Sequence, residues 1–311
     1  MTAMRHGVIC GIATLLCALM FAACGSSATP PAARNPAPLR SAGTVTAMIP
    51  GMGESSESGY DIVGDDTTIW VRNADTGDLM RIDPSTNKLV ADIPVGRGPG
   101  GVALGEGTVW AVSSLGAVSE IDPRTNTVVA TITVGQPVNA PKSLAVSPGA
   151  VWVADFSTNS LIRIDPQSHQ VVATIPNQPG TTGLSYGAGS VWACNHHSFN
   201  QGLARLDPQT NQMIAQINPN QVMAQTNPPS NLGACFNVKA AAQAVWTTTF
   251  VNGDPGSCLL ERIDPATNTV KATIPVPGVF PHALAADAHG VWVIDPSAGL
   301  YRVDPTTNRL A

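Results

Sequence analysis

Carboxylates recur along the chain at regular intervals, in a turn sequence of the form Asp-Pro-x-Thr-Asn. Its six copies place aspartates 39, 43, 42, 57 and 40 residues apart, at Asp83, Asp122, Asp165, Asp207, Asp264 and Asp304. Converging carboxylates can serve as general acid and general base. Here, however, each aspartate is followed by a proline, which presets φ for a turn, and by an Asn (His169 in the third copy) that tolerates a left-handed backbone. We therefore expect these aspartates to accept local backbone hydrogen bonds as parts of turns, not to form catalytic pairs.

Residues that depart from the repeat are the stronger candidates for activity. Lys142 and His282 stand at the mouths of two predicted inner strands, and Asp295 lies three residues after a tryptophan. A base, an acid and a carboxylate that converge on one face could catalyse a proton transfer, so these three residues are the catalytic candidates. The adjacent His196 and His197 point to opposite faces of an extended segment and have no Cys or carboxylate cluster beside them. We therefore expect no metal site there.

A wider group of positions is expected to face a ligand. Its members lie near the mouth of an inner strand or three residues after a tryptophan, and they are Tyr60, Arg97, Lys142, Asp155, Thr182, Asn195, Asn231, His282 and Asp295. The position three residues after the tryptophan is polar in all six copies. That regularity is also typical of a turn cap, and both interpretations stay open.

Each copy of the turn belongs to a unit of four predicted strands. In the third copy these are residues 144–146, 150–154, 161–164 and 171–175, joined by turn sequences rich in Gly, Pro, Ser and Asn. The six tryptophans precede the turn aspartates by 12 to 18 residues and are expected to fill the wedges between neighbouring sheets. Arginines two residues before the aspartate, in five copies, are expected to pair neighbouring units: Arg81, Arg163, Arg205, Arg262 and Arg302. A role of these arginines in sugar or phosphate binding is the alternative.

A strand-built period near 40 residues predicts an all-β, six-bladed β-propeller of four-stranded blades. The N-terminal segment Thr44–Pro50 matches the outer strands of other repeats and is expected to complete the last blade, which closes the ring. A seventh, irregular blade would have to come from Asn218–Asn231. That stretch contains Asn-Pro and Pro-Pro and no tryptophan, so we expect a loop insertion instead.

The connections are of unequal length on the two faces of the predicted propeller. Short turns such as Gly105–Gly107 lie on one face, whereas the other carries long segments, among them Gly135–Pro141, Asn195–Gly202 and Asn218–Asn231. Variable loops on a rigid scaffold are where binding residues usually lie. We therefore expect the functional site on the long-loop face and at its central opening.

The start of the chain is typical of an export signal. Arg5 precedes an apolar run from Val8 to Ala23 that is too short to span a bilayer comfortably. The sequence Phe21-Ala22-Ala23-Cys24 resembles the lipobox of bacterial lipoproteins, whose Cys becomes the lipidated, palmitate-bearing first residue. A plain secretory signal with an incidental Cys is the alternative. We expect a signal peptide at 1–23, Cys24 and a Pro/Ala/Ser-rich tether at 24–42, and the propeller at 43–311.

The charge balance argues against nucleic acid as a partner. Removal of residues 1–23 deletes one Arg and no acid, which takes the net charge from −5 to −6. The remaining Lys and Arg are scattered, so they give neither a nucleic-acid footprint nor a polybasic membrane patch. We expect a monomer that is anchored by lipid to the outer side of the cell membrane and contacts an envelope protein, peptide or glycan.

Two of the repeat units resemble a known family. The segments 262–276 (RIDPATNTVKATIPV) and 149–155 (GAVWVAD) are similar to the YVTN and streptogramin B lyase-like (NHL-like) propeller repeats of bacterial exported proteins. The resemblance implies an exported binding or scaffold module without a cofactor. It also implies an alternative, a lyase that uses His and Glu with magnesium to open a cyclic depsipeptide or lactone, although Lys142, Thr182 and Asn231 stand where further catalytic residues would be needed. Enzymatic activity is therefore left open.

Export makes a disulfide plausible among the cysteines of the mature chain. Cys235 begins a predicted inner strand, and Cys258 lies in a loop of the same blade on the same face. We expect these two cysteines to pair and Cys194 to be free and buried.

Overall fold

The protein is described from a computed structural model. The structure describes residues 61–73, 76–98, 100–135, 143–176, 178, 180–195, 202–218, 235–241, 243–250, 257–278, 283–295 and 299–311. The chain divides into two compact units, Met1–Thr46 and Ala47–Ala311, and the described residues all belong to the second. The predicted signal peptide, Cys24, the tether and the closing strand Thr44–Pro50 lie outside them. Within the described ranges, no helix has the length and apolar character needed to cross a bilayer.

Six four-stranded antiparallel sheets form the blades of a six-bladed β-propeller, as predicted. Blades 1 and 2 contain β1 (Asp61–Gly64), β2 (Ile69–Asn73), β3 (Asp78–Asp83), β4 (Lys88–Pro94), β5 (Val102–Gly105), β6 (Thr108–Val112), β7 (Ala117–Asp122) and β8 (Thr127–Thr133). Blades 3 and 4 contain β9 (Ser143–Ser147), β10 (Ala150–Asp155), β11 (Ser160–Asp165), β12 (Gln170–Ile175), β13 (Thr181–Gly187), β14 (Ser190–Asn195), β15 (Leu203–Leu206) and β16 (Met213–Ile217). Blades 5 and 6 contain β17 (Cys235–Ala241), β18 (Ala244–Phe250), β19 (Ser257–Asp264), β20 (Thr269–Pro277), β21 (Ala283–Ala286), β22 (Val291–Asp295), β23 (Gly299–Asp304) and β24 (Arg309–Leu310).

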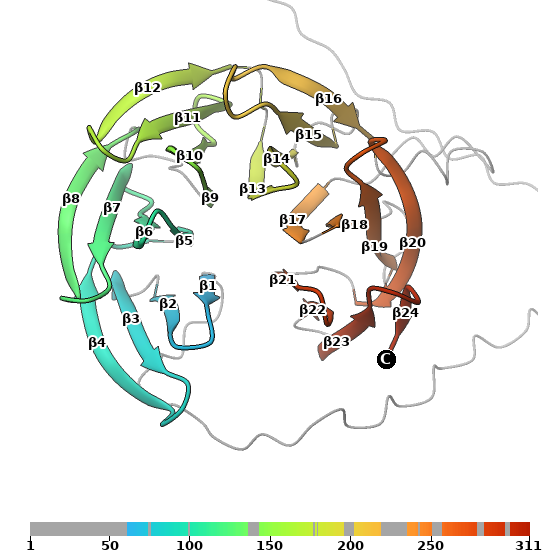
Figure 1. The fold of residues 1–311 in the computed structure, drawn as a ribbon, viewed down its shortest axis with the longest axis horizontal. Helices are drawn as coiled ribbons and strands as arrows, with labels where there is room; N and C mark the ends of the chain where they lie inside the picture. Colours follow the sequence, from blue (N-terminus) through green and yellow to red (C-terminus); the bar gives the residue numbers. More distant parts are fainter. Residues whose placement is uncertain are drawn as a thin grey trace, which may run out of the picture. The chain divides into compact units, whose positions relative to one another are not determined.

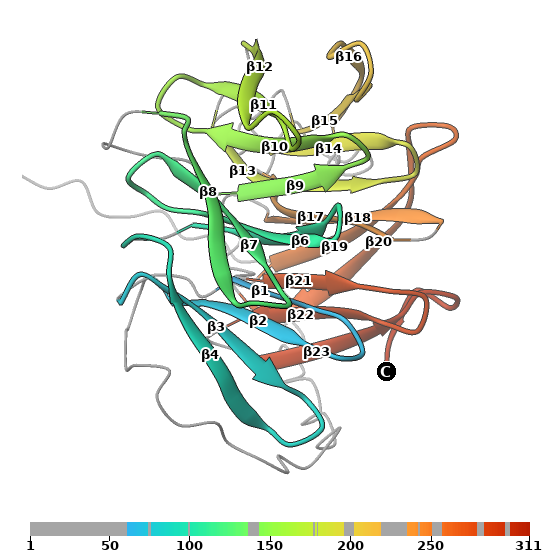
Figure 2. The same ribbon diagram turned by 60° about the vertical axis from the view of Figure 1, so that its left-hand side comes forward.

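The first strand of every blade lies innermost and the fourth lies on the outer rim. Figure 1 shows β1, β5, β9, β13, β17 and β21 around the centre, and the side-by-side succession of the blades is visible in Figure 2. The alternative of a seventh blade concerns Asn218–Asn231, of which only residue 218 is described.

The Asp-Pro turns adopt the predicted structure between the third and fourth strands. The amides of Ser85 and Gln167 each donate to the aspartate two residues earlier, at 2.8 Å, and the other copies repeat the contact. The closing residues are all left-handed, with φ from 54° to 61°, at Asn87, Asn126, His169, Asn211, Asn268 and Asn308. Because the amides of Gln167 and Ser168 stabilise the carboxylate, they lower the pKa of Asp165. The interpretation of these aspartates as scaffold is therefore confirmed.

The hydrophobic core consists of wedges between consecutive blades. Trp152 of blade 3, for example, packs against Leu184 and Val191 of blade 4 in one buried cluster. Five of the six tryptophans have exposed fractions of 0–1%, and they are Trp70, Trp110, Trp152, Trp192 and Trp246. Such rings bury about 150–250 Å² each, which makes them a major source of stability.

The face of blade 6 that carries Trp292 differs from this pattern. Trp292 is 36% exposed, Ile294 45% and Leu300 58%, although the residues equivalent to Leu300 in blades 1–5 are fully buried. The fourth strand of this blade, β24, pairs only with Val303 and Asp304 of β23 among the described residues. The segment predicted to complete this blade, Thr44–Pro50, lies outside the described residues.

The repeated arginines clasp one blade to the next. In blade 1, Arg81 Nη1 donates to Asn126 Oδ1 of the next turn at 2.9 Å, and its guanidinium lies 5.4 Å from the centre of the Trp70 ring. Blades 3, 4 and 5 repeat both contacts through Arg163, Arg205 and Arg262. The predicted pairing role is thus confirmed for four arginines, whereas Arg302 donates to the His289 carbonyl of its own blade at 2.7 Å.

Blade 2 is linked to blade 3 by a different pair of residues at the same two positions. Glu120 occupies the arginine position, and its Oε2 lies 2.6 Å from Nε2 of His169, which occupies the Asn position of the next turn. Both partners have changed together, so a hydrogen-bonded link between blades 2 and 3 is retained.

Candidate functional site

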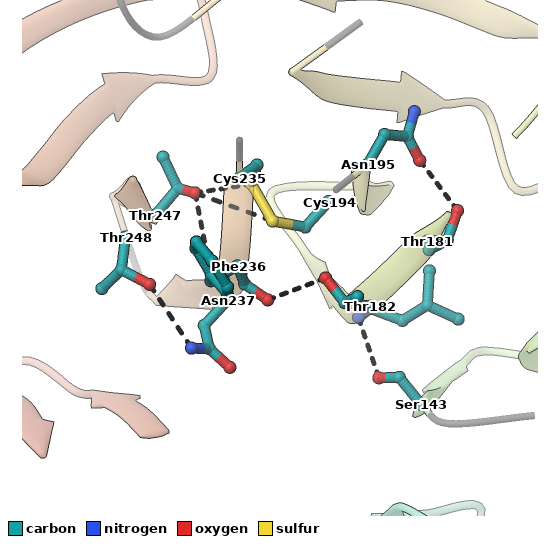
Figure 3. Close-up of a disulfide and its surroundings, with 11 residues drawn as sticks. Ser143, Thr181, Thr182, Cys194, Asn195, Cys235, Phe236, Asn237, Thr247 and Thr248 are labelled. Carbon is teal, nitrogen blue, oxygen red and sulfur yellow. Dashed lines mark hydrogen bonds between the residues drawn. A yellow bond between two sulfur atoms is a disulfide. The ribbon is translucent and has the colours of Figure 1, made fainter. Parts of the chain in front are cut away.

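Polar side chains line the inner strands at the centre of the propeller. The Asp61 carboxylate accepts a hydrogen bond from the Val102 amide of the next inner strand at 2.8 Å. In the same way, Ser143 Oγ accepts from the Leu184 amide at 2.9 Å, a contact drawn in Figure 3. Such contacts satisfy backbone groups on an edge where no further strand pairs. The inner strands are therefore linked to one another by side chains, around a polar opening.

Two of the central residues depart from the repeat. Asp61 stands where the other blades carry Gly101, Ser143, Gly183, Asn237 and Ala283, and Lys239 stands where they carry Val63, Ala103, Ala145, Ser185 and Ala285. Asp61 lies on β1 and Lys239 on β17, in blades that are not consecutive, yet the Lys239 charge acts on the Asp61 carboxyl. The two charged residues therefore lie on inner strands within electrostatic range of each other.

The electrostatic state of this pair is unusual for surface charges. Burial raises the pKa of Asp61, and the positive charge of Lys239 together with the amides of Val102 and Ile62 offsets this only in part. No ion pair within 4.0 Å joins Asp61 to Lys239. A half-buried acceptor and a separate donor thus lie at the centre, where a ligand could bond to both.

The polar residues that follow each tryptophan lie buried beneath the connections between blades. Asp155 is 3% exposed and caps its own turn, accepting hydrogen bonds from the Ser157 amide and the Thr158 hydroxyl. Asn195 is fully buried and accepts a hydrogen bond from Thr181 Oγ1 at 2.8 Å. Asp295 is 1% exposed, and a side chain at Gly278 would collide with it. The bonds of Asp155 therefore favour the turn-cap interpretation at that position, and burial argues against direct ligand contact at all three.

The remaining candidates are placed as follows. Thr182 is half-buried on β13, and its hydroxyl donates to the Phe236 carbonyl at 3.0 Å, so it belongs to the central opening (Figure 3). Arg97 is exposed on the loop after blade 1. Four candidates lie outside the described residues, namely Tyr60, Lys142, Asn231 and His282. Of the three catalytic candidates, only Asp295 is therefore placed. No group of three possible metal ligands occurs among the described residues.

The disulfide differs from the prediction. Cys194 on β14 and Cys235 on β17 are bonded, with Cα atoms 5.3 Å apart, and Cys258 is free and buried (Figure 3). Alternation along the strands explains the difference. Cys194 and Cys235 both face the wedge between blades 4 and 5, whereas Cys258 faces the wedge between blades 5 and 6. The expected pair, Cys235 with Cys258, therefore lies on opposite faces of one sheet and the prediction was wrong.

A second buried carboxyl was not anticipated from the sequence. Glu261 on β19 is 1% exposed, and its Oε2 has no hydrogen-bond partner among the described residues. Burial raises its pKa to about 8, so the side chain is largely neutral at neutral pH. The equivalent residues in the other blades are Met80, Ser119, Ile162, Ala204 and Tyr301. Comparison of the repeats at this position is the signal that could have identified it.

Comparisons with known proteins agree with this architecture. A model of a repeat of unknown function (DUF6923) matches residues 108–200. No curated protein matches the chain. Similar solved structures include a hydrazine synthase from Kuenenia stuttgartiensis, with 16% identity and a TM-score of 0.62 over 79% of this chain and 75% of that one. A streptogramin B lyase has 14% identity and a TM-score of 0.63 over 81% of each chain. The Pan2 WD40 domain of Neurospora crassa has 14% identity and a TM-score of 0.58 over 79% and 75%. At these identities the likeness shows the β-propeller fold alone.

Proposed function

We propose that this protein is an exported, lipid-anchored binding module that holds a protein, peptide or glycan of the cell envelope at its central opening. The β-propeller fold is consistent with a binding or scaffold role. The observation that carries the proposal is the pair Asp61 and Lys239, two charges that the repeat does not require and that lie apart at the centre. Partly buried charges that the repeat does not require are candidates for functional sites.

The chemistry of the pair suits a ligand rich in hydrogen-bonding groups. Asp61 offers a carboxylate acceptor that is already held in place by two backbone amides, and Lys239 offers an ammonium donor. Peptide amides and sugar hydroxyls both provide a donor and an acceptor close together. A hydrogen bond to a charged group contributes about 1.5–3 kcal/mol, so each residue should account for about 10–100-fold in affinity.

Binding to peptide and glycan arrays, followed by calorimetry with the strongest probe, tests this role. The matched variants are Asp61→Asn and Lys239→Met, each of which removes a charge and nearly preserves side-chain length. We expect each to weaken binding by about tenfold or more, and to lower the melting temperature by about 2–4 °C at most. Full affinity in both variants would contradict the proposal.

The anchor is tested separately. Cys24 follows a sequence similar to a lipobox, and acyl chains contribute about 0.8 kcal/mol per buried methylene. Wild-type protein should incorporate labelled palmitate and sediment with membranes, whereas Cys24→Ser should be unlabelled and released. An unlabelled wild-type protein would exclude the lipid anchor and leave the binding site untouched.

A lyase is the second candidate function, supported by the fold shared with a streptogramin B lyase. This activity would require His282 and a carboxylate to converge on a magnesium ion, and the described histidines, His169 and His289, both lie on the face of the Asp-Pro turns. Turnover of a cyclic depsipeptide or lactone with magnesium, lost in His282→Ala, would establish the lyase. No turnover at any magnesium concentration would eliminate it.

A further inference from the structure

A cavity of about 370 Å³ opens between blades 5 and 6, on the face of the Asp-Pro turns. It is lined by Ala241, Gln243, Ala244, Trp246, Arg262, Asp287, Ala288, Pro305 and Thr306. These residues come mainly from the turns β17–β18, β21–β22 and β23–β24, all of which lie at the end of the propeller opposite the long loops. The cavity is therefore distinct from the central opening, and its role is independent of the proposed function.

The cavity lies beside an arginine that is weakly hydrogen-bonded to the neighbouring blade. In blade 4, Arg205 donates through Nε to Ser190 Oγ at 2.9 Å and through Nη1 to Asn268 Oδ1 at 2.7 Å. In blade 5, Ala244 replaces that serine, and Arg262 Nη1 reaches Asn308 Oδ1 only at 3.5 Å. This is the sole hydrogen bond of Arg262 within the described part of the chain. A guanidinium has five N–H donors, so most of its bonding capacity is left for the cavity.

The guanidinium of Arg262 is also held in a position from which it could bind a ligand in the cavity. Its guanidinium lies 5.8 Å from the centre of the Trp246 ring, which holds it against an aromatic surface. Planar, pre-oriented guanidinium groups bind carboxylates through two parallel hydrogen bonds. The lining alanines leave room for a short apolar substituent beside that carboxylate.

Charges of both signs surround the cavity. The amides of His289 and Gly290 lower the pKa of Asp287, with smaller contributions from the charges of His289 and Arg302, so this carboxylate stays ionised. Arg302 is held nearby by its bond to the His289 carbonyl. Asp304, next to the lining residue Pro305, adds a second carboxylate in range of Arg302. The cavity therefore suits a ligand with groups of both kinds, a carboxylate for Arg262 and a donor for Asp287.

We propose that this cavity binds a small organic acid with a hydroxyl or ammonium group next to its carboxylate. Arg262 holds the ligand carboxylate, and Asp287 accepts from the neighbouring hydroxyl or ammonium. The volume falls in the range of small-molecule sites, about 300–1,000 Å³. The equivalent arginines of blades 1 and 4 each have a second acceptor in the next turn, the carbonyl of Pro123 or Pro265, whereas Arg163 of blade 3 has one hydrogen bond among the described residues, as Arg262 has. Blade 5 is distinguished by the cavity beside its arginine.

Calorimetric titration of the intact protein with lactate, alanine, acetate and sulfate tests the proposal. We expect lactate or alanine to bind with a Kd in the millimolar range or tighter, and acetate and sulfate to bind at least about tenfold more weakly. Which of the two ligands binds better distinguishes a hydroxy acid from an amino acid. Failure of both to bind at about 10 mM, or equal binding of sulfate, would overturn the proposal.

Matched variants separate a specific site from general folding effects. Arg262→Lys should weaken binding about tenfold or more, whereas Arg205→Lys, the same change in the engaged clasp of blade 4, should leave affinity unchanged. Asp287→Asn should weaken lactate or alanine without weakening acetate. Equal loss in both lysine variants, or no loss in Arg262→Lys, would contradict the assignment.

Discussion

Replacing Glu261 by methionine should stabilise the propeller, and more so as the pH rises. The carboxyl is 1% exposed, and Met80 occupies the equivalent position in blade 1. Burial raises the pKa of Glu261 from 4.5 to about 8. The folded chain therefore holds a proton that the unfolded chain has already released, and stability falls as pH rises through that window.

The size of this effect follows from the two pKa values of Glu261. At about pH 7 the solution is about 2.5 pH units above the pKa of the unfolded carboxyl, which is therefore ionised. Each unit corresponds to about 1.4 kcal/mol, so taking up a proton on folding lowers the free energy of unfolding by about 3 kcal/mol. Below pH 4.5 the carboxyl is protonated in both states and the loss vanishes. Glu261→Met removes the penalty, so its advantage over the wild type should grow by about 3 kcal/mol from about pH 5 to pH 8.

Urea unfolding followed by tryptophan fluorescence at several pH values measures this difference. The exposed Asp66 provides the control, because Asp66→Asn removes a carboxyl without relieving burial. Wild type and Asp66→Asn should lose stability together above about pH 5, whereas Glu261→Met should stay nearly flat. Parallel pH profiles for wild type and Glu261→Met would refute the reasoning.

Three further predictions concern the disulfide, the last blade and the anchor. Cys194→Ser should lower the free energy of unfolding by about 4 kcal/mol, because Cys194 and Cys235 close a loop with a sequence separation of 41. Reductant should not lower the stability of this variant further. An unchanged midpoint of urea unfolding would contradict this prediction. Ile49→Asp should increase iodide quenching of Trp292 fluorescence, because we expect Ile49 to cover this ring. The Trp292 signal is obtained by subtracting the fluorescence of a Trp292→Phe variant. Equal quenching with and without the Ile49 substitution would exclude closure of the ring by this segment. Cys24→Ser should move the protein from the membrane to the soluble fraction, and retention on the membrane would point to another attachment.

The blades could be predicted because the residues that determine their structure recur in every repeat. One tryptophan, one Asp-Pro turn and one arginine per unit are enough to place the wedge, the turn and the clasp, and each follows from local alternation along a strand. Even the exception in blade 2 obeys the rule. Glu120 and His169 depart from the repeat at two positions that one clasp joins, so the change is visible in the sequence once the pairing is known.

Contacts between blades were harder to predict than contacts within them. The disulfide joins two neighbouring sheets, and finding it required following alternation from Trp192 to Cys194 and then across to Cys235. The apposition of Asp61 and Lys239 depends on the closure of the whole ring, because the two residues belong to blades that are not consecutive. No local pattern carries that information.

The polar residues after each tryptophan show how two interpretations of one pattern can be separated. Asp155 and Asn195 match both a ligand contact and a turn cap in sequence. The bonds of Asp155 to its own turn support the cap, whereas Asn195, which is fully buried, bonds to Thr181 on the neighbouring strand β13. Exposure depends on the packing of the following loop, which the residue type alone does not determine.

Ligand affinity measured side by side in Asp61→Asn and Asp83→Asn tests most directly whether departures from the repeat carry the binding function. Both changes remove one carboxylate from blade 1, the first at the centre and the second in a repeated turn. Asp61→Asn should weaken binding of the strongest array probe by about tenfold or more, with a fall in melting temperature of about 2–4 °C at most, because the new side chain can still accept one of the two backbone hydrogen bonds. Asp83→Asn should keep full affinity and lose about 2–4 °C in melting temperature. The reverse result, with affinity lost in Asp83→Asn and retained in Asp61→Asn, would contradict the account.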